Sequence, residues 1–155
     1  MTTINDGLVR QFTSSWKMLR QAIEKVPDDH WFKGTKNWVF ARGVFHIIQT
    51  ADFYLQNTPE GFDWKKRLGN LDWETSDPEA FPSKDEQLTY LNEIETQISS
   101  VLQTMKDVEL LDKDGFHWFN SILEKFIYLL RHNMHHIGEL GQMLREWEFD
   151  KIKWE

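Results

Sequence analysis

The sequence contains no cysteine in 155 residues. This absence excludes disulfides, thiolate-ligated zinc or iron–sulfur sites and a cysteine nucleophile. Long apolar runs are also missing, since no stretch approaches the roughly 18 residues that a membrane-spanning helix needs. Residues 1–7 have neither the basic nor the apolar region of a signal peptide. We therefore expect a cytoplasmic protein with no membrane partner.

Positive charge is scarce, with 18 basic against 25 acidic side chains and a net charge of −7. Because an acidic chain without a basic block is repelled by phosphate backbones, we expect no nucleic-acid partner. A hydrophobic fraction of 40% excludes a disordered chain. The eight tryptophans and eleven phenylalanines are interpreted mainly as core side chains, with an aromatic-lined pocket as the alternative. The length fits a single domain over residues 1–155.

Glycine and proline are few, and no window alternates apolar and polar residues as a strand does. Apolar residues recur instead at steps of three and four, which predicts helices. The predicted helices span residues 4–26, 37–57, 83–105 and 121–148. Pro27 ends the first, and Asn37 is expected to cap the second. Ser83 and Ser121 each begin a capping-box pattern at the start of the third and fourth.

Four amphipathic helices of this length predict an all-α protein, a four-helix bundle. The predicted connection over residues 58–82 is long, and such connections are often functional. The aromatic residues expected to pin it to the bundle are Phe62, Trp64, Trp73 and Phe81. Because this loop is long enough to cross the end of the bundle, the pattern alone leaves the order of the helices open.

The apolar stripe of the fourth predicted helix is interrupted at Asn133 and His136, with His132 on its edge. Since residues four apart lie about 6 Å apart along a helix, His132 and His136 can reach one metal ion. His46 borders the apolar stripe of the second predicted helix and can supply a third imidazole if the two helices pack together. Three histidines with one open position are typical of a catalytic metal site. The alternative is that each is a hydrogen-bonded core histidine.

The other histidines are predicted to lie outside such a site. His30 and His117 fall in predicted loops, and His135 shares a polar helix face. Polar residues that can orient the ligands or a substrate are Gln49, Thr50 and Asn133. Neither H-E-x-x-H nor Glu-x-x-His occurs, so the sequence supports neither a zincin-type protease nor a di-iron carboxylate bundle.

Residues 131–140 resemble the H-x-x-H-H-x-G-[QE] signature of the DinB-like (damage-inducible) family. Val26-Pro27 and Trp31, followed by His46 in a helix entered through Trp38, are similar to that family's first histidine region. The resemblance covers nearly the whole chain in layout. It implies an up-down-down-up bundle with a long loop between the second and third helices. It also implies a metal ion held by the three residues His46, His132 and His136.

The resemblance further implies a metal-dependent enzyme that is often a thiol S-transferase, and frequently a homodimer. The ion would be Zn²⁺, Ni²⁺ or Fe²⁺ and would activate a water, as in a hydrolase, or a low-molecular-weight thiol toward a small-molecule substrate. Ile137 departs from the arginine common at its position, and Glu139 is expected on the outer surface. The alternative function is a non-catalytic helical stress-response or interaction protein with a structural or vestigial metal site.

Overall fold

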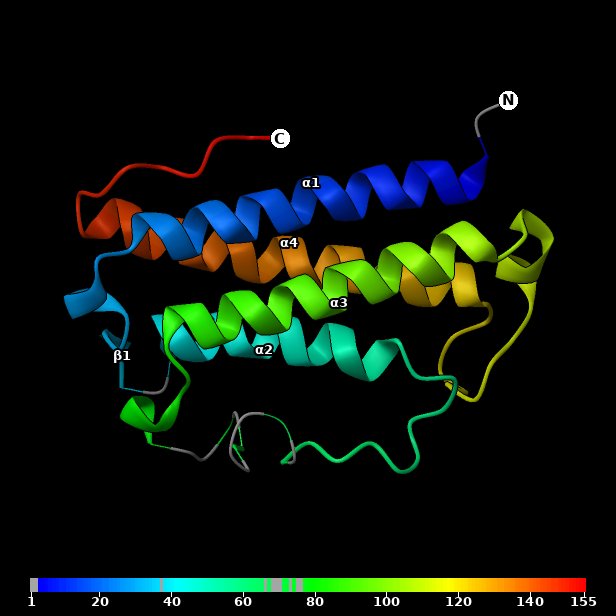
Figure 1. Ribbon diagram of the computed structural model, residues 1–155, viewed down its shortest axis with the longest axis horizontal. Coiled ribbons are helices and arrows are strands. Elements are labelled where there is room, and N and C mark those ends of the chain that lie inside the picture. Colours follow the sequence, from blue (N-terminus) through cyan, green and yellow to red (C-terminus); the bar gives the residue numbers. More distant parts are fainter. Residues whose placement is uncertain (1–2, 37, 66, 68–70, 73, 75–76) are drawn as a thin grey trace.

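The computed structural model describes residues 3–36, 38–65, 67, 71–72, 74 and 77–155. Four long helices lie side by side and form a bundle (Figure 1). They are α1 (Ile4–Lys25), α2 (Phe40–Tyr54), α3 (Lys84–Thr104) and α4 (Ile122–Glu146). The predicted all-α four-helix bundle is therefore confirmed, and α1 ends ahead of Pro27 as expected.

The helices follow an up-down-down-up order. In Figure 1, α1 and α4 run in one direction along the bundle while α2 and α3 run in the other. Helix α1 packs against α3 and α4, and α2 packs against the same two helices. The consecutive helices α2 and α3 run parallel, so the connection between them has to return the chain to the end of the bundle at which α2 begins. This is the order that the family resemblance implied.

The two predicted capping boxes differ in the structure. At α3 the box is complete, because Ser83 N donates to Glu86 Oε2 at 2.8 Å and Glu86 N donates to Ser83 Oγ at 3.4 Å. At α4, Ser121 Oγ accepts from Glu124 N at 3.1 Å, but the Glu124 carboxylate accepts from Asn120 N at 2.7 Å. The prediction that Ser121 is the N-cap of α4 is therefore confirmed. The predicted bond from the Ser121 N–H to Glu124 is wrong, because the Glu124 carboxylate accepts from the N–H of the preceding residue, Asn120.

A small antiparallel hairpin between α1 and α2 was not expected. Strands β1 (Gly34–Thr35) and β2 (Trp38–Val39) pair with Gly34 opposite Val39. Two-residue strands are too short to show an alternating pattern, so the sequence gives no sign of them. Helix α2 begins at Phe40 with Val39 at its N-cap, and Asn37, the predicted cap, lies outside the described residues.

Helix α2 is the most enclosed element, since all its residues are buried except His46. The sequence pattern assigned it one apolar face, but described residues of the segment that follows also lie against its outer side. Phe53 meets the rings of Phe62 and Trp64, and Asp52 accepts from Arg67 Nε. Gln49 Nε2, fully buried, donates to the Trp64 carbonyl at 2.6 Å and ties this segment to α2. Among the predicted pinning residues, Phe81 is buried, Phe62 and Trp64 are half-buried, and Trp73 lies outside the described residues.

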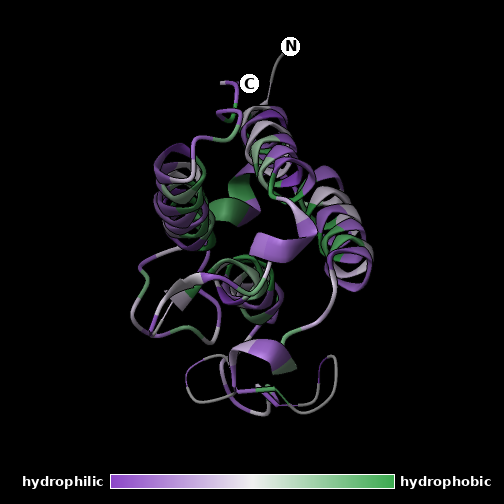
Figure 2. Cartoon of the chain, turned by 90° about the vertical axis from the view of Figure 1, so that its left-hand side faces the viewer, coloured by the Kyte–Doolittle hydropathy of each residue, from purple (hydrophilic) through white to green (hydrophobic). Residues whose placement is uncertain are grey.

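The core lies between the four helices, and its buried hydrophobic residues form one cluster. Figure 2 shows the hydrophobic stretches of these helices in green, in a view from one end of the bundle. Its largest fully buried side chains include Phe12, Trp16, Phe40, Phe45 and Phe126. The interpretation of tryptophan as core material holds for Trp16 and Trp31. Within the described part of the chain, no helix has both the length and the apolar character to cross a membrane.

Candidate metal centre

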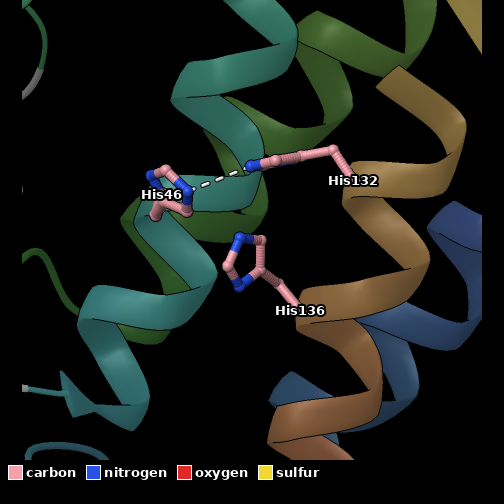
Figure 3. A group of neighbouring side chains, drawn as sticks. All are labelled: His46, His132 and His136. Carbon is pink, nitrogen blue, oxygen red and sulfur yellow. Dashed lines mark hydrogen bonds between the residues drawn. The ribbon is translucent and has the colours of Figure 1, made fainter. Parts of the chain in front are cut away.

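Three histidines meet in the seam where α2 packs against α4 (Figure 3). His132 Nε2 and His46 Nε2 are 3.0 Å apart. The ring centre of His136 lies 4.7 Å from that of His46 and 4.5 Å from that of His132. One nitrogen from each ring can be chosen so that all three lie within 4.8 Å of one another. The structure thus brings together the three residues that were predicted as ligands.

Helix geometry and one glycine allow the three histidines to lie close together. His132 and His136 are one turn apart on α4 and therefore project from the same side. Gly43, one turn before His46, lies close to side chains of α4 and β2. A Cβ atom at Gly43 would lie 3.0 Å from Leu140 Cδ2 and 3.3 Å from Trp38 Nε1. The missing side chain therefore lets α2, α4 and β2 approach one another at the level of the histidines.

Aromatic rings lie against the histidine cluster on two sides. Trp38 stacks on His136 with ring centres 5.4 Å apart and planes 30° apart, and meets His46 edge-on at 5.6 Å. Tyr128 stacks on His132 at 6.4 Å and 28°. These contacts fix the planes of the imidazole rings. Aromatic rings thus contact the cluster on two sides, while other tryptophans lie in the core.

Burial keeps two of the imidazoles neutral. It lowers the pKa of His46 to about 3, with smaller contributions from the neighbouring His132 and His136. It likewise lowers the pKa of His132 to about 4, and nearby His136 adds to this shift while a contact with Asn133 opposes it. At neutral pH both rings are therefore in the neutral form, the form of imidazole that binds metal ions. All three side chains are half-buried, so the seam is accessible from solvent.

The donor set fits a divalent transition-metal ion. Neutral imidazole nitrogen suits zinc, nickel and iron. Bonds of about 2.0–2.1 Å in a tetrahedral arrangement place two ligand nitrogens about 3.3–3.4 Å apart. The observed 3.0 Å between the Nε2 atoms of His46 and His132 is close to that separation. Small rotations of the rings would therefore be enough to accommodate an ion.

The three predicted orienting residues have different positions. Gln49 uses its amide to hold the Trp64 carbonyl, so it anchors the covering segment. Thr50 is buried one turn beyond His46 on α2. Asn133 is fully buried on α4 next to His132. Its nearby amide slightly opposes the lowering of the pKa of His132.

One carboxylate at the site was not anticipated. Glu139 was expected on the outer surface, and its side chain is indeed 42% exposed. Its Oε2 nevertheless lies 2.7 Å from His136 Nδ1, and its Oε1 lies 3.5 Å from Nε2 of His135. The spacing of three residues along α4 was the signal available in the sequence. The outer-surface assignment was therefore incomplete.

The remaining histidines lie outside the cluster, as predicted. His135 is 67% exposed on the outer side of α4. His30 contacts Asp29 and the rings of Trp147 and Phe149, and His117 packs against Trp118.

Fold and site together define a class of protein: an up-down-down-up helical bundle with a histidine cluster between two antiparallel helices. A family model described as the DinB superfamily matches residues 11–140, a range that contains all three histidines. The chain therefore belongs to the DinB superfamily, as its sequence resemblance indicated. A comparison with curated proteins finds no match.

Proposed function

We propose that the protein is a metal-dependent enzyme that holds one divalent transition-metal ion through His46, His132 and His136. The observation that carries this proposal is the convergence of three imidazoles from two helices within 4.8 Å. Structural zinc sites are usually closed by four protein ligands, whereas catalytic sites have three and keep one position open. The three-histidine set therefore favours a catalytic role over a purely structural one.

A bound ion would act as a Lewis acid that makes a water or a thiol more acidic at neutral pH. His46 and His132 stay neutral at that pH, so protons do not compete for their lone pairs. Trp38 and Tyr128 present aromatic surface on either side of the cluster, which suits an organic small molecule. Because the chain has no cysteine, a reacting thiol has to come from a low-molecular-weight cosubstrate.

Two reactions are candidates within this proposal. We favour thiol S-transfer, and hydrolysis is the alternative. The family resemblance supports the first. In S-transfer, the thiol loses its proton, its sulfur forms a bond to an electrophilic carbon, and the leaving group departs with the electron pair of the broken bond. In hydrolysis, water takes the place of the thiol.

A non-catalytic interaction protein is the second candidate. Exposed apolar side chains near the start of α4 favour it. They are Val108 at 67%, Leu111 at 63%, Trp118 at 45% and Ile127 at 53% exposure. Exposed apolar side chains also suit the homodimer that we propose from the family resemblance. Light scattering coupled to size-exclusion chromatography tests the dimer, and a monomer at micromolar concentration would contradict it.

Metal analysis of protein purified without a histidine tag tests the metal site. We expect close to one transition-metal ion per chain, falling sharply in the His132→Ala and His136→Ala variants. Metal-loaded protein is then assayed with a panel of thiols and electrophiles. Turnover that is lost in a folded His46→Ala variant supports the enzyme. Bound metal without turnover for any pair favours the interaction protein.

A further inference from the structure

The unanticipated carboxylate of Glu139 lies on the far side of His136 from the other two ligands. In Figure 3, one ring nitrogen of His136 faces His46 and His132 while the other points away from them. Glu139 Oε2 lies 2.7 Å from the Nδ1 atom, a normal distance for a charge-assisted hydrogen bond. The carboxylate thus occupies the position behind a candidate ligand.

We propose that Glu139 is a positioning residue that orients His136 for metal binding, an inference that rests on the proposed function. A neutral imidazole has a single N–H, and an ionised carboxylate can only accept. The short contact therefore places the proton on Nδ1 of His136 and leaves the Nε2 lone pair directed into the seam. A carboxylate behind a ligating histidine fixes its tautomer and ring orientation and makes it a stronger donor.

Two contacts restrict different motions of the His136 ring. Stacking on Trp38, with planes 30° apart, fixes the plane of the His136 ring. The bond to Glu139 fixes the rotation within that plane. Both Glu139 and His136 belong to α4 and are three residues apart, so ordinary helix geometry keeps them together.

The neighbouring His135 provides a matched control. Its Nε2 lies 3.5 Å from the other oxygen of Glu139, and its ring is 67% exposed. It shares the helix, the carboxylate and the residue type with His136, but it lies outside the cluster. His135→Ala removes an imidazole from the same carboxylate and leaves the contact to His136 in place.

Zinc affinity, measured by competition with a chromophoric chelator, is the first test. We expect E139A to bind zinc about 10- to 100-fold more weakly than the wild type. E139Q keeps a carbonyl oxygen that can accept from Nδ1 but loses the charge, so its affinity should lie between the two. H135A removes the edge-on contact between the rings of His135 and His136, whose centres lie 4.9 Å apart, but keeps the hydrogen bond between Glu139 and His136. Its zinc affinity should therefore stay within about twofold of the wild type. Wild-type affinity in E139A would overturn the proposal.

The tautomer of His136 in metal-free protein is the second test, read from long-range ¹H–¹⁵N NMR spectra at pH 8. We expect Nδ1 to be protonated in the wild type, to lose this preference in E139A and to regain it in E139Q. A proton on Nε2 in the wild type would overturn the proposal. If the wild type binds no zinc, the proposed function fails and the positioning role falls with it. If the wild type binds zinc and E139A binds equally well, the positioning role alone fails.

Discussion

Helix α2 contributes polar side chains to two clusters, one shared with α4 and one shared with α3. The two clusters differ in the kinds of side chain that they contain. Toward α4 it presents His46, which meets two further imidazoles. Toward α3 it presents Asp52, whose Oδ2 accepts from Tyr90 Oη at 2.7 Å and from Arg67 Nε at 3.0 Å. Asp52 is buried like the rest of the helix, whereas His46 is half-buried.

In the cluster around Asp52, here called the acidic cluster, the polar groups are complementary. The carboxylate accepts from the hydroxyl of Tyr90 and from the cationic Arg67. Burial and the adjacent carboxylate raise the pKa of Tyr90, which therefore stays protonated and donates to Asp52. The histidine cluster instead gathers three side chains of the same kind, and burial lowers the pKa of His46 and His132. Complementary partners are the rule for structural polar clusters. Three imidazoles that converge on one place are a donor set that an external cation can use.

The largest expected effect is on metal affinity. His46→Ala should lower zinc affinity by more than about 100-fold, because even outer-shell changes cost 10- to 100-fold. Asp52→Asn, on the same helix but in the other cluster, should leave the affinity within about twofold. Isothermal titration of metal-free proteins measures both. Equal losses in the two variants would mean that the clusters do not differ in function.

The second effect is a loss of stability in acid. The folded pKa values of about 3 for His46 and about 4 for His132 lie below the ordinary value of 6.5, so the unfolded chain takes up protons first. This stabilisation is present above pH 6.5 and is lost as the pH falls toward 4 and 3. Between pH 7 and pH 5 the unfolding free energy should fall by roughly 2 kcal/mol for each of the two histidines.

Urea unfolding of metal-free protein across this pH range measures the effect. A His46→Asn/His132→Asn double variant is the control, and its unfolding free energy should depend less steeply on pH. Identical pH profiles for the wild type and the double variant would show that the two imidazoles are not held neutral.

The third effect concerns the acidic cluster. Asp52→Ala should lower the unfolding free energy by about 2–3 kcal/mol, because the buried Tyr90 hydroxyl loses a charged acceptor. Zinc content should not change. Tyr90→Phe removes the donor instead and should cost less, since Arg67 still pairs with the carboxylate. A cost below about 0.5 kcal/mol for Asp52→Ala, in the range of an ordinary surface substitution, would show that this cluster contributes little to stability.

The smallest effect is expected at Gly43. Alanine there gains up to about 1 kcal/mol of helix propensity, which crowding against Leu140 and Trp38 offsets. We expect a stability change within about 1 kcal/mol and weaker zinc binding, because α2 has to move away from α4. Gly138→Ala is the control, since a Cβ at Gly138 meets nothing within 4 Å. It should stabilise the protein and leave zinc affinity unchanged.

The sequence predicted the four helices because each carries its own signals. Ser83 and Ser121 begin helices where expected, and α1 stops before Pro27. The placement of His132 and His136 on one side of α4 followed from helical phase alone. These are local properties, which periodicity and capping chemistry report directly.

The parts that were missed depend on contacts between distant segments or on side-chain conformation. Polar residues such as Arg42, Gln49 and Asp52 lie among the apolar residues of α2. The pattern therefore placed His46 beside the apolar stripe but could not show that this side meets α4, and the resemblance implied the same ligand. The two-residue strands of the hairpin follow from bonding between Gly34 and Val39, which no local pattern encodes. Glu139 lies on an exposed face, and only its rotamer shows that it contacts His136.

Anomalous diffraction from crystals of the tag-free protein loaded with zinc tests the central claim most directly. We predict one strong peak in the seam between α2 and α4, about 2.0–2.1 Å from one nitrogen each of His46, His132 and His136. Fully loaded crystals with no peak in the seam, or with zinc only at exposed positions such as His135, would contradict the account.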